Sequence, residues 1–241
     1  MLLVSPALRC RTVITIVAMF GVLAGCGAGE PRSVDPAGVD GLEIPIASPD
    51  PRDFVREIDN PYLPLAPGSR WTYESDADPG ETVRVEVSAK TRTIAGIAAT
   101  EVSTTLSSSE GGDGADDLTS VDYFAQDRDG NVWSFGSDDW LAGVEGAQAG
   151  LVMPAIPRIG DGFRRQYAAG VAEDRTQVLD TAADAATPFG SWTGVVEMLD
   201  TSSLAEQVET RRFYAAGVGL VKSETSSSTI ELVAYEAGDP Q

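Results

Sequence analysis

Between residues 60 and 236 the sequence consists of short runs in which apolar and polar residues alternate, and Gly, Pro and Asp separate the runs. A period of two places successive side chains on opposite faces of a strand, so each run predicts a half-buried β-strand. No stretch of 12 residues has the 3.6-residue period of an amphipathic helix. The sequence therefore predicts an all-β domain.

The alternating runs are short and closely spaced, as expected for antiparallel strands joined by turns. Their number predicts a domain of about 10–12 strands, arranged as an antiparallel curved sheet or a partly closed barrel. The runs lie at residues 70–75, 81–89, 91–94, 98–106, 118–126, 132–135, 163–168, 175–181, 194–200, 208–215, 220–224 and 229–236.

Three short motifs in the first half of this region recur in the second half, in the same order. Their spacings are nearly constant, at 92, 94 and 90 residues. We therefore predict an internal duplication with halves at residues 61–150 and 154–241, the alternative being chance similarity among β-rich segments. The matched positions are Gly68 with Gly160, Gly96 with Gly190, and Ala125 with Ala215.

The first 25 residues have the composition of a secretory signal peptide. Arg9 and Arg11 provide a positively charged flank, and residues 13–23 form an apolar run of 11 residues. That run is too short to cross a bilayer, which takes about 20 residues. The small residues Ala24 and Gly25 then come directly before a cysteine, as at a cleavage site.

The stretch Leu23-Ala24-Gly25-Cys26 resembles the lipobox of bacterial lipoproteins. The resemblance implies cleavage before Cys26 and attachment of a diacylglyceryl group to its thiol. The other cysteine, Cys10, lies in the segment to be removed, so the mature chain cannot form an internal disulfide. Two acyl chains anchor a protein stably, whereas one does so only marginally. We therefore expect an exported protein, lipid-anchored on the extracytoplasmic face of the cell membrane.

Residues 26–60 contain Pro31, Pro36, Pro45, Pro49 and Pro51. Such a composition predicts an extended tether after the lipidated N-terminus. The predicted organisation is thus a signal peptide at 1–25, a tether at 26–60 and a β domain at 61–241.

The chain is strongly acidic, with a formal net charge of −20 at pH 7. Removal of residues 1–25 would take away Arg9 and Arg11 but no acid, leaving 15 basic and 37 acidic residues, a charge of −22. Such a surface repels nucleic acid and anionic lipid headgroups. We expect no nucleic-acid partner, and membrane contact through the lipid anchor.

The sequence contains no histidine, which excludes Ser-His-Asp and Cys-His relays and His-ligated zinc. No other catalytic motif is recognisable, so the sequence favours a non-enzymatic protein and predicts no catalytic residue and no cofactor. Carboxylate pairs remain open, because their separation in space decides their chemistry and the sequence does not show it.

One loop resembles the start of a calcium-binding loop: Asp127, Asp129 and Asn131 have the i, i+2, i+4 spacing of oxygen ligands. The glycine at 130 is misplaced for that motif, and no bidentate Glu follows at the right distance. A hairpin turn is the favoured interpretation. Asp113, Asp116 and Asp117 lie in a Gly-rich loop that we expect to be solvated, so no metal site is predicted.

The phrases at residues 60–65, 67–73 and 214–222 resemble those of a family of exported bacterial proteins of unknown function. The resemblance covers most of residues 60–236 and implies an antiparallel β domain, but no chemistry.

These observations favour a binding or structural role at the cell envelope, with a lipid or another envelope molecule as the possible ligand and protein partners unknown. A first alternative is a carrier of lipids or other amphiphiles, which needs an apolar cavity; residues 140–153, from Trp140 to Met153, could line its opening or could simply be a buried linker. A second alternative is a carboxylate-dependent glycan hydrolase.

Overall fold

The structure is a computed structural model that describes residues 38–77, 80–107 and 117–239. The predicted signal peptide, Cys26, Asp113 and Asp116 lie outside the described residues. Within the described part, the secondary structure is β-strand apart from one 3-10 turn, η1 (Pro51–Asp53). No helix among these residues has the length and apolar character that crossing a bilayer requires.

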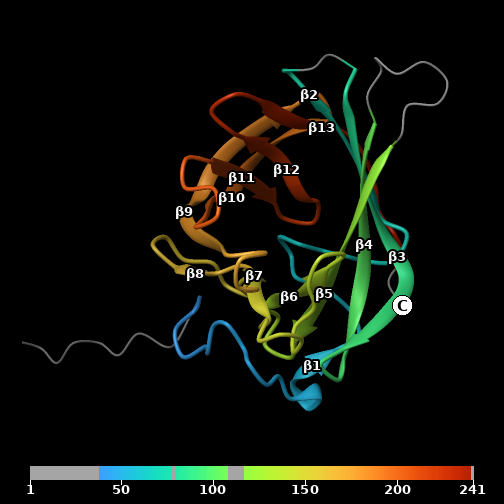
Figure 1. Cartoon of the computed structure of the whole chain (residues 1–241). Coiled ribbons are helices and arrows are strands. Elements are labelled where there is room, and N and C mark those ends of the chain that lie inside the picture. Colours follow the sequence, from blue (N-terminus) through green and yellow to red (C-terminus); the bar gives the residue numbers. More distant parts are fainter. Residues whose placement is uncertain (1–37, 78–79, 108–116, 240–241) are drawn as a thin grey trace, which may run out of the picture. The chain divides into compact units, whose positions relative to one another are not determined.

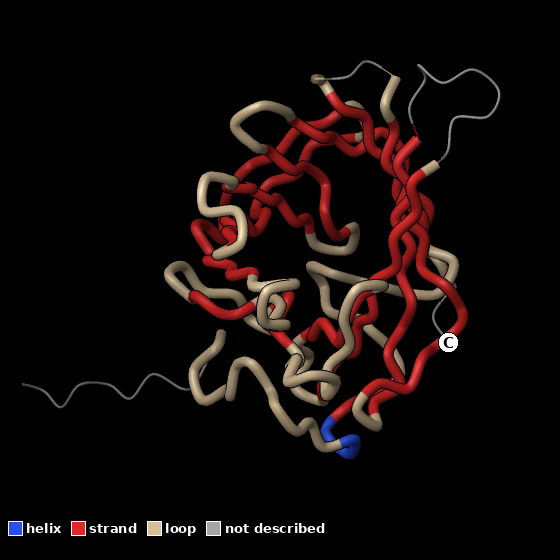
Figure 2. Tube along the Cα trace, in the orientation of Figure 1, coloured by secondary structure: helices blue, strands red, loops and turns tan. Residues whose placement is uncertain are grey.

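The described residues form one antiparallel sheet of 13 strands that closes into a barrel with a single seam (Figures 1 and 2). The strands are β1 (Phe54–Val55), β2 (Arg70–Ser75), β3 (Thr82–Ile94), β4 (Ile97–Ser107), β5 (Leu118–Asp127), β6 (Val132–Ser137), β7 (Gly150–Met153), β8 (Gly162–Arg164), β9 (Asp174–Thr187), β10 (Gly190–Ser202), β11 (Glu209–Ala215), β12 (Gly219–Glu224) and β13 (Thr229–Glu236).

The strand order is β7-β6-β5-β4-β3-β2-β13-β12-β11-β10-β9-β8, with β1 added beside β5. The seam therefore lies between β7 and β8. It is bridged by Gln148, whose backbone pairs with that of Tyr167. A Cβ atom at Gly150 would lie 2.3 Å from the carbonyl oxygen of Arg165. Only a residue without a side chain allows the two edges to approach this closely, so the barrel is nearly closed.

The all-β prediction is confirmed, and the structure has one strand more than the upper end of the predicted range. The runs predicted at 81–89 and 91–94 form the single strand β3, with a register shift between Val87 and Thr91. Two further strands, β1 and β7, were not predicted. β1 has only two residues, and β7 is buried throughout and shows no alternation between apolar and polar residues.

The two predicted halves have the same strand order. Strands β2 to β7 form one six-stranded meander and strands β8 to β13 form a second, joined side by side through β2 and β13. The pair Gly96 and Gly190 lies at equivalent hairpins, β3–β4 and β9–β10. The pair Ala125 and Ala215 lies on equivalent strands, β5 and β11. The arrangement is the one that a duplication would produce, and the duplication itself stays a prediction.

The segment from residue 38 to residue 60 differs from the predicted tether, because it belongs to the β domain. Val39, Leu42 and Ile44 are partly buried against the core. The backbone of Ile46 pairs with that of Ala149, and Phe54 contacts Phe135 edge-on with ring centroids 5.3 Å apart. The proline-rich composition indicated an extended backbone but did not reveal that its apolar side chains are buried. The β domain therefore begins near residue 38 and not at residue 61.

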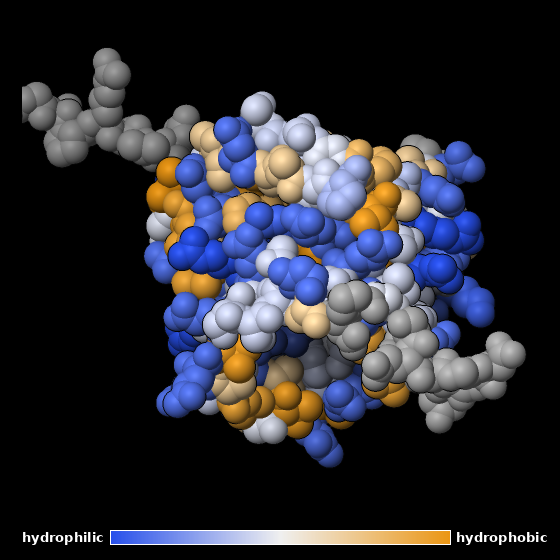
Figure 3. Space-filling view, turned by 90° about the horizontal axis from the view of Figure 1, so that it is seen from above, coloured by the Kyte–Doolittle hydropathy of each residue, from blue (hydrophilic) through white to orange (hydrophobic). Residues whose placement is uncertain are grey.

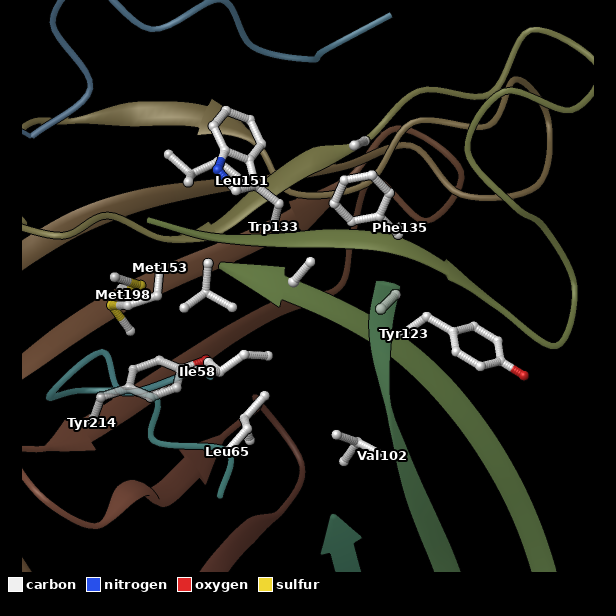
Figure 4. Close-up of a cluster of buried hydrophobic side chains, with 14 of the residues drawn as sticks. Ile58, Leu65, Val102, Tyr123, Trp133, Phe135, Leu151, Met153, Met198 and Tyr214 are labelled. Atoms are coloured by element: carbon white, nitrogen blue, oxygen red, sulfur yellow. The ribbon is translucent and has the colours of Figure 1, made fainter. Parts of the chain in front are cut away.

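The core occupies the barrel interior and includes side chains from the segment that precedes β2 (Figure 4). Ile58 and Leu65 come from that segment and are 4% and 5% exposed. Trp133, Leu151 and Met153 come from β6 and β7 and are at most 1% exposed. Residues 56–65 therefore fill one end of the barrel, and their burial ties the N-terminal segment to the sheet.

Candidate functional site

The pairing register places charged residues on the interior face of the second meander. Met198 of β10 is fully buried and pairs with Arg212 of β11. Two residues along β10, Asp200 pairs with Thr176 of β9. Because directly paired residues share a face of the sheet, Asp200, Arg212 and Thr176 point to the same side as Met198. The interior face of the second meander therefore carries a charged cluster next to its buried apolar residues.

The cluster is organised around the Asp200 carboxylate. Its Oδ2 atom lies 3.1 Å from the guanidinium of Arg165, which directly follows β8, and 2.9 Å from that of Arg212. Its Oδ1 atom accepts a hydrogen bond of 2.5 Å from the hydroxyl of Thr176. The side chains of Asp200 and Arg165 are 10% and 15% exposed, whereas that of Arg212 is 28% exposed. The cluster is thus nearly closed to solvent.

Two carboxylates of this region have pKa values shifted in opposite directions. Burial alone would raise the pKa of Asp200, but Arg165 and Arg212 outweigh it and hold the pKa below its usual range. Burial raises the pKa of Asp122, on β5 across the barrel, and the same two arginines offset this only in part. The difference arises because Asp200 contacts both guanidiniums, whereas no ion pair of Asp122 is found among the described residues.

Opposite pKa shifts are a feature of acid and base pairs in glycoside hydrolases. The contacts of Asp200 argue against that chemistry here. Both of its oxygens are occupied, one by Thr176 and the other by two guanidiniums. A carboxylate held in this way balances buried charge, because both of its oxygens contact donors of the protein itself. We therefore interpret the cluster as a structural ion network.

A pocket of about 670 Å³ lies beside the core, between the N-terminal segment and the β3–β4 hairpin. Its floor is formed by the buried side chains of Ile58, Leu65 and Thr100. The remaining lining alternates short apolar side chains with charged and hydroxyl-bearing ones. The residues that line it are Arg56–Asp59, Pro64–Pro67, Ser88, Ala89, Thr91, Ala98 and Thr100. This volume is within the range of small-molecule binding sites.

One wall of the pocket is fixed by hydrogen bonds. The Oε1 atom of Gln126 accepts the backbone N–H groups of Asp59 and Asn60, at 3.0 and 2.9 Å. Its Nε2 group donates to Oδ1 of Asp59 at 2.6 Å. The side chain of Asn60 donates to the carbonyl oxygen of Gly130 at 2.8 Å. The wall is therefore held in place before any ligand binds, which lowers the entropic cost of binding.

The bulge in β3 forms the opposite wall. Between Val87 and Thr91 the strand loses its regular pairing with β4, and Ser88 and Ala89 lie in this interval. A bulge redirects side chains away from the alternating pattern of the strand. Thus an irregularity in the sheet, and not a loop, gives this side of the pocket its shape.

The aspartates predicted as calcium candidates form a hairpin turn. Asp127 accepts the backbone N–H groups of Asp129 and Asn131, the amide of Asn131 and the indole N–H of Trp133, at 2.8 to 3.0 Å. The carboxylate of Asp127 is therefore used within the turn, as the preferred interpretation expected. Asp117 is exposed at the start of β5, and Asp113 and Asp116 lie outside the described residues.

Residues 140–153 do not line an apolar opening. Trp140 is 7% exposed, and Leu151 and Met153 are fully buried in the core. Of the two interpretations given to this segment, the structure supports the buried linker. Residues 140–153 therefore do not provide the apolar opening that the carrier alternative required there.

The sequence did not identify the residues of the charged cluster or of the pocket. The sequence did contain a signal for the cluster. In the run 194–200, Asp200 follows Val196 and Met198 at steps of two residues, so the alternation places it on the same face of the strand as these apolar residues. A charged residue at a core-facing position indicates a buried partner. For the pocket no signal existed, because its two walls are about 30 residues apart in sequence and meet only through the fold.

The comparisons with known proteins give a distant similarity of fold. No protein family model matches the chain, and no curated protein matches it. A protein from Bacteroides fragilis, described as exported and as having a YMCC-like fold, is 15% identical; the alignment covers 73% of this chain and 99% of that one, with a TM-score of 0.44.

A second solved structure, described as a lipoprotein from Parabacteroides distasonis, is 13% identical with a TM-score of 0.38. The alignment covers 73% of this chain and 98% of that one. At these values neither similarity supports an assignment of function. The described residues form an antiparallel, nearly closed β-barrel domain with a filled interior and a pocket on its side.

Proposed function

We propose that this chain is an exported, lipid-anchored protein whose β domain binds a small amphipathic molecule at the cell envelope. The observation that carries the binding role is the pocket of about 670 Å³ beside Ile58 and Leu65. The barrel interior is filled by side chains, so this pocket is the best-supported place for a ligand.

The lining of the pocket indicates the chemistry of the ligand. Ile58, Leu65 and Pro64 offer apolar surface, while Arg56 and Glu57 place charges at its rim. An apolar floor favours burial of hydrocarbon, and polar groups at the rim orient a polar end toward solvent. A molecule with one apolar part and one polar part satisfies both.

The anchor is supported by the sequence of the first 26 residues. The charged flank, the apolar run of 11 residues and the stretch Leu23-Ala24-Gly25-Cys26 occur together and in the order that export and lipidation require. The acidic composition agrees with a solvated domain outside the cytoplasm, because negative charge favours solubility.

A ligand can be identified by native mass spectrometry of the purified protein, followed by thermal unfolding with the molecule that co-purifies. At a ligand concentration of a hundred times Kd, binding stabilises the fold by about 2.7 kcal/mol, which raises Tm by roughly 5–10 °C for a domain of this size.

Two variants distinguish binding in the pocket from binding elsewhere. Ala98→Trp places an indole in the pocket from an exposed position on β4, and it should abolish the rise in Tm. Ala186→Trp adds the same group at an exposed position on β9 and should leave the rise unchanged. Equal behaviour of the two variants would exclude the pocket as the binding site.

The anchor is tested separately by replacing Cys26 with Ala. The wild-type chain should be recovered in the membrane fraction with a diacylglyceryl mass on its N-terminal peptide, and the variant should lack this mass. Wild-type protein found in the medium with an unmodified N-terminus would contradict the anchor and leave the ligand pocket untouched.

A further inference from the structure

The loop between β7 and β8 exposes two large aliphatic side chains. Ile156 is 63% exposed and Ile159 is 65% exposed, on either side of Pro157 and Arg158. Isolated apolar residues at a surface are common and need no partner. Two isoleucines on a single short loop, however, can insert together into the apolar part of a membrane surface.

This loop lies where the described chain begins. Arg158 forms an ion pair with Asp40, and a Cβ atom at Gly38 would contact the side chains of Asp161 and Arg158. Figure 1 shows the first described residues, in blue, running beside β8. The N-terminal segment therefore enters the β domain at the exposed isoleucines.

The distance from the proposed lipid attachment site to this loop is limited by covalent structure. Eleven residues, 27–37, separate Cys26 from Gly38. A chain of this length spans at most about 40 Å whatever its conformation. A lipidated Cys26 thus leaves Ile156 and Ile159 within reach of the membrane surface, beside the point where the described chain begins.

The opposite end of the barrel offers a matched comparison. Ala155 donates its backbone N–H to Asn131, so Ile156 lies near the turn that ends β5 at Asp127. Leu118 begins β5 and is 68% exposed. Leu118 and Asp127 are nine residue steps apart along β5, and the distance between them is therefore roughly 30 Å. The two ends expose similar aliphatic side chains, but only one lies at the start of the described chain.

We infer that the β7–β8 loop is a membrane contact, in which Ile156 and Ile159 insert into the lipid surface beside the anchored N-terminus. The inference rests on the proposed lipid anchor and adds to it an orientation. Because the mature chain is strongly acidic, the contact is apolar in origin, and it should not require anionic lipid.

The experiment uses the full-length lipidated protein in vesicles of phosphatidylcholine. Cys10 is removed with the signal peptide and the thiol of Cys26 is acylated, so an introduced cysteine is the single free thiol of the mature chain. An environment-sensitive fluorophore is attached to Ile156→Cys in one sample and to Leu118→Cys in the other. Both positions are exposed, so neither substitution disturbs the core.

The fluorophore at position 156 should show blue-shifted emission and quenching by lipid-borne quenchers, and the fluorophore at position 118 should show neither. In a chain labelled at position 156, Ile159→Ser should lower the equilibrium constant of loop insertion, obtained from the quenched and unquenched fractions, about tenfold, because burial of one Ile side chain is worth at least that factor. Vesicles that contain anionic lipid should give the same or weaker contact.

Each outcome is decisive. Equal emission at positions 118 and 156 in protein that floats with the vesicles overturns the inference and leaves the anchor intact. Failure to float, together with an unmodified Cys26 peptide in the mass spectrum, overturns the anchor and the inference with it. Quenching at position 156 that requires anionic lipid would contradict the apolar origin of the contact.

Discussion

Asp200 holds two guanidinium groups inside the barrel, and its removal should leave both without a counter-charge. We expect Asp200→Asn to lower the free energy of unfolding by about 3–5 kcal/mol, the usual cost of removing one partner of a buried ion pair. Glu86 of β3 pairs with Arg70, and both side chains are exposed, at 43% and 50%. Glu86→Gln should cost less than about 1 kcal/mol. Urea denaturation at pH 7 measures both, and equal losses would contradict a buried network.

Asp122 should behave in the opposite way to Asp200. Burial raises its pKa, so the folded protein binds this proton more tightly than the unfolded chain does. The carboxylate therefore costs stability once the pH rises through the raised pKa. We expect Asp122→Asn to raise the free energy of unfolding at pH 7 by up to about 1 kcal/mol.

The pH dependence separates the two carboxylates. The gain from Asp122→Asn should vanish in acid, where the unfolded and folded carboxyl groups are both protonated. Asp200 has a lowered pKa, so its contribution is present above the pKa of the unfolded chain and is lost as the pH falls through the lowered value. Urea titrations of the two variants at several pH values between 3 and 7 test this, and a gain from Asp122→Asn that persists at pH 3 would be inconsistent with the cause given.

At the scale of single residues, the sequence supports predictions only where the signal is local. Leu23 to Cys26 are contiguous, so the proposed lipid attachment site is visible without the fold. Asp200 and Arg165 are 35 residues apart, and their contact depends on how β8, β9 and β10 pair. The alternation of β10 could have shown that Asp200 faces the core, but it could not have named its partners.

Among the elements, the segment before β2 shows how tertiary contacts override composition. Its prolines indicated a free tether, whereas Gln126 and Asn60 connect it to β5 and to the turn that follows. Gln126→Ala removes the group that accepts the buried N–H of Asn60 and the part-buried N–H of Asp59, and a buried donor left unsatisfied costs about 1–3 kcal/mol. We expect residues 56–65 to lose hydrogen-exchange protection in this variant before the strands do.

The control for this prediction is Gln177→Ala, at an exposed position on β9. Its exchange profile should match that of the wild type. If the protection of residues 56–65 is unchanged in Gln126→Ala, then apolar burial of Ile58 and Leu65 alone holds the segment, and the hydrogen bonds contribute little.

Alternation between apolar and polar residues predicts a strand best where one face of the strand is exposed. In β2, Trp71 and Tyr73 alternate with exposed or half-exposed residues, and the alternation is visible in the sequence. In β7 all four residues are buried, so the run has no alternation and follows a stretch rich in Ala and Gly. Strands buried on both faces resemble any other apolar run, which explains why this one was missed.

For the molecule as a whole, closure of the barrel makes the two meanders depend on each other. The halves meet along β2 and β13, where six residue pairs are formed across one register shift, and again at the seam between β7 and β8. The interior residues of the two halves belong to one hydrophobic cluster, while the face seen in Figure 3 is largely hydrophilic with scattered apolar residues. A duplicated unit that once folded alone would have needed a partner copy to cover this face.

The dependence of the halves can be measured by cutting the chain between Pro157 and Arg158, in an inserted protease site within the exposed β7–β8 loop. After separation in denaturant, each fragment alone should fail to recover the near-ultraviolet circular dichroism of its aromatic side chains, because a six-stranded meander leaves its apolar face in water. Refolded together, the fragments should recover that signal and elute as one particle. A cooperative unfolding transition in either isolated fragment would show that the half is a domain by itself, and the barrel would then be an assembly of two domains and not a single folding unit.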